Sequence, residues 1–162
     1  MSIDHLLKYL DRLSTDKPPR LYHSLDKVFE CAFYIGPNIQ QEKDEEKKTQ
    51  IASYFNKSVT KIDNYLFRKG NSFVCDHVPY IMTLRSGLQF IMDYYNTFKD
   101  ADGCKLQNCL DYLIENQTIE ILDESLYHWK KTGVVTEDNA TISACEITRP
   151  INIPSSHWWW FD

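Results

Sequence analysis

The chain has 162 residues, of which 43% are hydrophobic and 14% aromatic, so it is too apolar for a disordered protein. Its formal charge of -5 favours solubility and, averaged over the whole surface, repels nucleic acid. The five glycines are scattered singly along the chain, which excludes the glycine-rich loops that cradle nucleotide phosphates.

Length and hydropathy predict one globular domain over residues 1–149, followed by an extended aromatic tail over residues 150–162. No apolar run is long enough for a membrane span, and no basic-then-apolar leader opens the sequence. We therefore expect a cytoplasmic or nuclear protein with no membrane partner. The five cysteines, an odd number, then indicate reduced thiols.

The first predicted elements are a helix, a connector and a strand. Apolar residues at helical spacing predict a helix over residues 1–13 with Ser2 as its cap, and a short strand inside this range is the alternative. Two adjacent prolines mark a connector over residues 14–20, because proline cannot continue a helix. The β-branched and aromatic run at 28–35 predicts a buried strand.

The middle of the chain is predicted to continue with a helix, a strand and a second helix. The charged run at 40–48 suits a solvated helix start, and apolar residues then recur at helical spacing until Gly70 supplies a stop. Residues 72–78 predict a second strand, closed by a proline. Helical spacing returns over residues 84–98.

The last third is predicted to hold a helix over 106–121, a short helix over 124–131, and strands at 134–135 and 141–148. Strands and helices alternate over residues 28–98. We therefore predict an α/β (α+β) fold, a small central antiparallel sheet of about three strands flanked by helices.

Four motifs stand in a fixed order in the first half of the chain. They are Tyr-Leu-Asp-Arg at 9–12, Phe-Tyr-Ile-Gly at 33–36, a Lys-to-Gly run at 61–70 and Thr-Leu-Arg-Ser-Gly at 83–87. This order resembles the GIY-YIG nuclease module, especially the version found in animal endonucleases that also carry ankyrin repeats and a LEM domain. The resemblance covers roughly half of the chain.

The resemblance implies metal-assisted hydrolysis of phosphodiesters, in which a tyrosine, an arginine and a glutamate-held divalent cation act together. Tyr34 matches the family's tyrosine, and a core aromatic residue is the alternative interpretation. The arginine expected soon after Gly36 is absent, and positions 81 and 86, where glutamates are expected, hold Ile81 and Ser86. We therefore predict a degraded site with no metal, and magnesium only if activity survives.

A basic surface is predicted in the middle of the chain. The segment 47–70 carries six basic residues against one acidic residue, so it could bind DNA phosphates, and an ordinary solvated surface is the alternative. The predicted nucleic-acid-binding residues are Lys57, Lys61, Arg68, Lys69 and Arg85.

The carboxyl terminus carries four consecutive large aromatic residues, Trp158, Trp159, Trp160 and Phe161. They cannot all lie on one side of a strand, so some must face solvent or a partner. They either fold back onto the domain or bind a protein groove.

Three function hypotheses follow: a degraded GIY-YIG-like domain that binds DNA or protein, an active metal-dependent endonuclease, and an unrelated α-rich protein-interaction module. A zinc site and a reactive cysteine have less support in the sequence. Cys75, His77, Cys104 and Cys109 match no standard zinc spacing, and Cys31 is expected to pack in the core.

Overall fold

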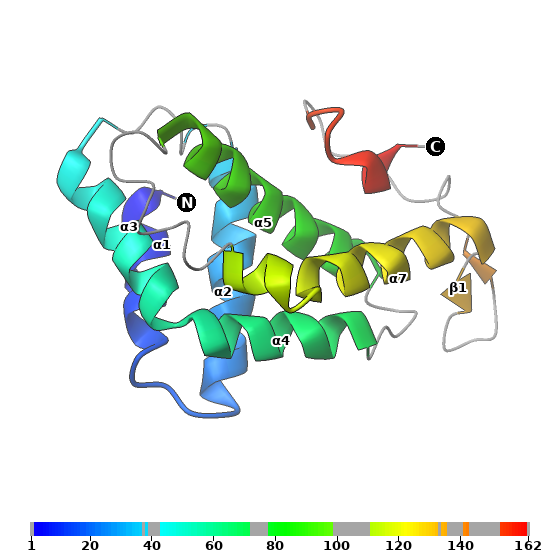
Figure 1. Ribbon diagram of the computed structural model, residues 1–162, viewed down its shortest axis with the longest axis horizontal. Helices are drawn as coiled ribbons and strands as arrows, with labels where there is room; N and C mark the ends of the chain where they lie inside the picture. Colours follow the sequence, from blue (N-terminus) through cyan, green and yellow to red (C-terminus); the bar gives the residue numbers. More distant parts are fainter. Residues whose placement is uncertain are drawn as a thin grey trace.

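The computed structural model is built from helices (Figure 1). It describes residues 2–36, 38, 43–71, 78–98, 111–132, 134–135, 141–142 and 153–161. The long helices are α1 (Ile3–Arg12), α2 (Arg20–Ile35), α3 (Glu45–Lys57), α4 (Val59–Asn71), α5 (Val78–Phe98) and α7 (Thr118–Thr132). A helical turn at 111–115 precedes α7, and a 3₁₀ helix, η4 (Trp158–Trp160), lies near the carboxyl terminus.

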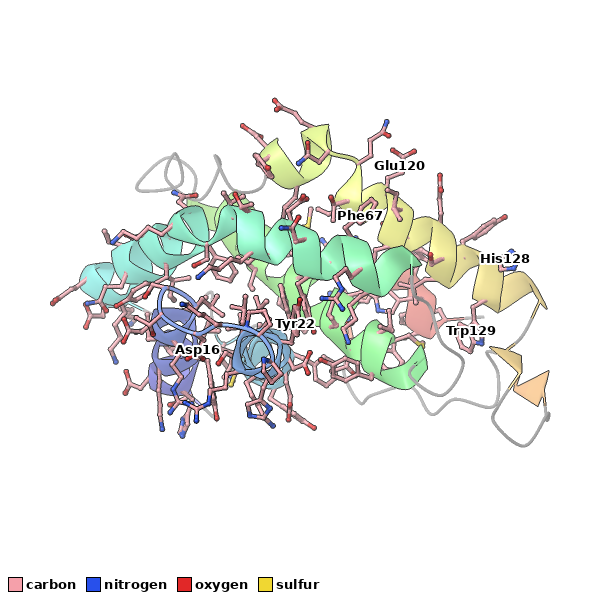
Figure 2. The ribbon with its side chains drawn as sticks, turned by 90° about the horizontal axis from the view of Figure 1, so that it is seen from below. Asp16, Tyr22, Phe67, Glu120, His128 and Trp129 are labelled. Carbon is pink, nitrogen blue, oxygen red and sulfur yellow. The ribbon has the colours of Figure 1, made fainter. Side chains whose placement is uncertain are left out.

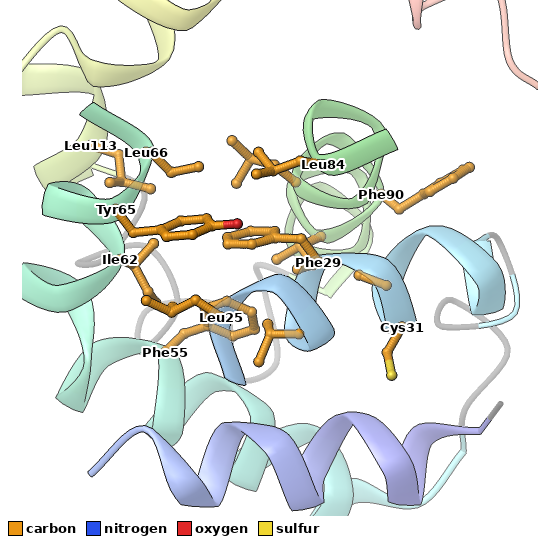
Figure 3. Packing of buried hydrophobic residues seen from close by; sticks show 14 of the residues in the cluster. Leu25, Phe29, Cys31, Phe55, Ile62, Tyr65, Leu66, Leu84, Phe90 and Leu113 are labelled. Atoms are coloured by element: carbon orange, nitrogen blue, oxygen red, sulfur yellow. The ribbon is translucent and has the colours of Figure 1, made fainter. Parts of the chain in front are cut away.

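The hydrophobic core forms around α2, which packs against α1 and α5, while α4 packs against α7. In the centre, the ring of Phe29 from α2 stacks on Tyr65 from α4, with ring centroids 6.0 Å apart (Figure 3). Gly87 of α5 lies against the backbone of α2, because a Cβ added there would meet the Phe29 carbonyl oxygen at 2.2 Å. The missing side chain therefore lets the two helices approach closely.

The predicted central sheet is wrong. Residues 28–35, predicted as a strand, form the second half of α2. The strands in the described chain are β1 (Val134–Val135) and β2 (Thr141–Ile142), a short antiparallel pair beyond the end of α7 (Figure 1). Of the predicted strand at 72–78, only Val78 is described, and it begins α5.

The strand prediction failed because its window was too short. The buried positions of α2 keep helical spacing from its first turn onward, at Leu21, Ser24, Leu25, Val28, Phe29, Cys31, Ala32 and Ile35. The preference of β-branched and aromatic residues for strands reflects packing and burial, so it is overridden where one helical face can be buried completely.

Several helix predictions are confirmed. The helix expected over 1–13 is α1, although the Ser2 hydroxyl contacts His5 Nδ1 at 2.9 Å and makes no side-chain cap bond to the backbone. The helical pattern that ends near Gly70 divides at Ser58 into α3 and α4. The spacing at 84–98 belongs to α5, and the short helix expected at 124–131 lies within α7.

Two carboxylates, half-buried Asp26 and buried Asp63, join the helices by hydrogen bonds. Tyr65 of α4 donates its hydroxyl to Asp26 of α2, and its oxygen lies 3.0 Å from the Tyr80 hydroxyl of α5. Burial, together with the Asp26 carboxylate, raises the pKa of both tyrosines, so both remain protonated donors. The Asp63 carboxylate of α4 accepts a hydrogen bond from the Thr118 hydroxyl, which fixes α4 to the first turn of α7.

Candidate functional site

The carboxyl-terminal segment, residues 153–161, packs back onto the helices. Its 3₁₀ helix η4 contacts α7 (Figure 1), and the Trp159 side chain is only 1% exposed. Trp158 and Trp160, on either side of it, are half-buried. The Trp158 ring meets Tyr127 of α7 nearly edge to face, with centroids 6.4 Å apart. The segment therefore contributes one residue to the core and another to the surface of α7.

One hydroxyl group holds this segment in place. Ser86 Oγ of α5 accepts the indole N–H of Trp159 at 3.0 Å and that of Trp160 at 2.7 Å. His157 Nδ1 lies 2.8 Å from the same oxygen. An indole nitrogen can only donate, so both lone pairs of the hydroxyl are used and its hydrogen points to His157 Nδ1. Trp159 Nε1 also reaches the Met82 carbonyl oxygen at 3.1 Å.

His157 must be neutral in this arrangement, since its Nδ1 accepts the Ser86 hydrogen. Burial lowers the pKa of His157 to about 4; the Asp93 carboxylate acts in the opposite direction, and Arg85 lowers it further. Within the described residues, the buried Nε2 of His157 has no hydrogen-bond partner. A proton added to Nδ1 would remove the acceptor on which the Ser86 hydroxyl relies.

An ion pair between buried Arg85 and half-buried Asp123 lies beneath the segment. The guanidinium of Arg85, in a residue 5% exposed, donates to Asp123 through Nε at 2.6 Å and through Nη2 at 3.3 Å. Its third contact is Gln89 Oε1 at 3.1 Å. The same guanidinium lies over the Trp159 ring, 4.6 Å from the centroid. Arg85 is thus held between a carboxylate and an aromatic ring.

An open groove of about 510 Å³ runs along the outer side of α7, beside this segment. It is lined by Ile114, Ile119, Glu120, Asp123, Glu124, Tyr127 and Trp158. Ile114 is 57% exposed and Tyr127 is 54% exposed, which is high for large apolar side chains. Figure 2 shows Glu120 on the outer surface of α7.

The groove combines apolar walls with negative charge. Asp123 is neutralised by Arg85. Among the described residues, no basic side chain pairs with Glu120 or Glu124, so two carboxylates remain at the surface. Such a surface suits a ligand that is both cationic and apolar.

The predicted DNA-binding residues do not form one free basic face. Arg85 is buried in its ion pair with Asp123 and cannot reach a phosphate without leaving it. Lys61 is half-buried and donates to the Leu13 carbonyl oxygen near the end of α1. Lys57, the last residue of α3, is exposed.

The two remaining basic residues contact aromatic rings of the same molecule. Arg68 donates to the Tyr22 hydroxyl and lies over its ring, 4.6 Å from the centroid. Lys69 Nζ lies 5.4 Å from the centroid of Tyr65 and 5.3 Å from that of Tyr80. These cation–π contacts fix α4 to α2 and α5, so the basic charges serve the fold.

Tyr34, the predicted catalytic residue, lies on the last turn of α2, where it is 63% exposed. It is therefore not a core residue, and its catalytic role stays a prediction. Its ring meets the Phe33 ring edge to face, with centroids 5.4 Å apart. The predicted aromatic anchor is divided: Trp159 is buried in its own domain, while Trp158, Trp160 and Phe161 are partly exposed.

No group of three or more metal-ligating side chains occurs in the part of the chain that the structure describes. Cys75, His77, Cys104 and Cys109 lie outside that part. Cys31 is buried in α2, and burial raises the pKa of its thiol. Magnesium binding, implied by the resemblance only for an active enzyme, stays a prediction. None of the described helices has the length and apolar character needed to cross a membrane.

The groove residues on α7 were not predicted from the sequence. Glu120, Asp123, Glu124 and Tyr127 are spaced three and four apart, so they share one helical face. This spacing is visible in the sequence once the helix is known to begin at Thr118. No family model, curated protein or solved structure matches this chain.

Proposed function

We propose that this chain is an α-helical protein-interaction module whose groove on α7 binds a basic, partly apolar peptide segment of a partner protein. The observation that carries the proposal is the groove itself, where exposed Ile114 and Tyr127 stand beside the carboxylates of Glu120 and Glu124.

Exposed tyrosine and tryptophan rings are typical of binding hot spots, because they bury a large area at little cost in side-chain entropy. Carboxylates beside them favour a partner of opposite charge and speed its approach. The net charge of -5 adds a long-range attraction for basic partners.

The helical fold favours this function over the two that derive from the nuclease resemblance. Those two require a central sheet with Tyr34 on its face, whereas Tyr34 lies on α2. Binding of DNA through residues 47–70 stays a prediction, and it is weakened because Lys61, Arg68 and Lys69 make contacts within the molecule.

The experiment is a fluorescence-anisotropy titration with a labelled short peptide in which arginine alternates with leucine. Two matched peptides replace all arginines by glutamate or all leucines by serine. We expect the arginine–leucine peptide to bind most tightly, with affinity falling as salt is raised, because the surface charges are screened.

Charge reversal places the binding on the groove. Glu124→Lys is expected to weaken binding about tenfold. The control is Glu46→Lys on α3, which makes the same charge change at an exposed helical position away from the groove. Equal losses for the two variants, or equal affinity for the glutamate peptide, would contradict the proposal.

A further inference from the structure

The groove has an aromatic corner at one end. The rings of Tyr127 and Trp158 meet at an interplanar angle of 70°, with centroids 6.4 Å apart. Glu124 precedes Tyr127 by three residues and Glu120 by seven, so both carboxylates project from the same side of α7. A cation placed in this corner would contact aromatic rings and a carboxylate at the same time.

The protein already holds one arginine in this manner, at Asp123 of the same helix. The Arg85 guanidinium lies over the Trp159 ring and pairs with Asp123. Trp158 precedes Trp159 in the sequence and Glu124 follows Asp123, and both line the groove. Trp158 and Glu124 therefore offer an aromatic ring and a carboxylate, as Trp159 and Asp123 do for Arg85. Glu124 has no basic partner among the described residues.

We infer that the groove recognises an arginine side chain of the partner, seated in the corner formed by the Tyr127 and Trp158 rings and paired with Glu124 or Glu120. This inference rests on the proposed peptide-binding function and names the residue that anchors the peptide. Arginine fits better than lysine because its guanidinium is planar, stacks on aromatic rings and binds a carboxylate through two N–H groups. A lysine ammonium is a compact and strongly hydrated charge.

The first test is a peptide series measured by isothermal titration calorimetry. One position of a leucine-flanked peptide is varied among arginine, lysine, citrulline and glutamine. We expect arginine to bind about tenfold more tightly than lysine, and the two neutral residues to bind more weakly than both. Equal affinity for arginine and lysine would overturn the inference while leaving the proposed function intact. No binding of any basic peptide would overturn both.

The second test removes the corner. Tyr127→Ala is expected to weaken the arginine peptide about tenfold and to abolish its advantage over lysine. The control is Tyr112→Ala, which removes an exposed tyrosine of the 111–115 turn that does not line the groove. Thermal unfolding of each variant checks that the fold is kept. If arginine is still preferred in Tyr127→Ala, the anchor is not this corner.

A third measurement locates the anchor directly. The chain has four tryptophans, and in protein labelled with 5-fluorotryptophan the ¹⁹F signals of Trp158 and Trp129 can be assigned with Trp158→Phe and Trp129→Phe. Saturation with the arginine peptide should shift the Trp158 signal and leave that of Trp129, which is buried, unchanged. An unmoved Trp158 signal at saturation would overturn the inference.

Discussion

Ser86→Ala should detach the carboxyl-terminal segment from α5. The Ser86 hydroxyl is the partner of three buried or half-buried nitrogens, in His157, Trp159 and Trp160. Alanine leaves Trp159 with the Met82 carbonyl, whereas the His157 Nδ1 and the Trp160 Nε1 lose the partner shown here. Both atoms then carry the cost of desolvation without a hydrogen bond.

A buried polar atom without a partner costs about 1–3 kcal/mol. His157 is fully buried and should show this cost in full, while half-buried Trp160 can recover part of it from water. Alanine regains about 0.5 kcal/mol of helix propensity over serine. We therefore expect the free energy of unfolding to fall by about 2–3 kcal/mol.

The assay is urea unfolding followed by tryptophan fluorescence and by far-ultraviolet circular dichroism. The control is Ser53→Ala at a half-buried position of α3, where the change should stay within about 0.5 kcal/mol. A fluorescence change that precedes the loss of helix would show the segment leaving first. If Ser86→Ala loses no more stability than the control, the hydroxyl does not hold the segment.

Three further outcomes are expected. Because the pKa of His157 is lowered from 6.5 to about 4, the unfolded chain takes up a proton at a higher pH than the folded chain does. The free energy of unfolding should therefore fall between pH 6.5 and pH 4, by about 3 kcal/mol more than in His157→Asn. Asparagine is the control because it keeps a hydrogen-bond acceptor but does not titrate. Gly87→Ala should destabilise by at least about 2 kcal/mol or prevent folding, because its Cβ would collide with the Phe29 backbone; thermal unfolding measures this. Thr118→Val keeps the shape but removes the donor to Asp63, and should cost about 1–3 kcal/mol in urea unfolding.

The spacing of apolar residues predicted a helix correctly where the segment considered contained the whole apolar face of that helix. In α1, apolar residues recur over the entire helix, and the prediction is confirmed. In α2, the window began at Val28, after the first two turns, so a helical face looked like a continuous apolar run. An extension of the window back to Leu21 would have shown the correct spacing.

The candidate site could not be predicted in the same manner, because it depends on tertiary contacts. Arg85 looked like a basic surface residue, but its charge is matched by Asp123, which lies far along the chain. The groove joins Ile114, α7 and Trp158, which meet only after folding. The acidic spacing on α7 was present in the sequence, but nothing in it indicated which aromatic ring would lie beside it.

The carboxyl-terminal segment connects the core to the groove through two neighbouring residues. Trp159 points inward, where it is held by Ser86 and contacts Arg85, while Trp158 forms a wall of the groove. Because the two rings belong to one 3₁₀ helix, Trp158 can stay beside Tyr127 only while Trp159 remains seated. Loosening of the segment from within, as in Ser86→Ala, should therefore weaken peptide binding even though Ser86 does not line the groove. Such a loss in a variant whose helices remain folded would show that the groove is assembled by the tail.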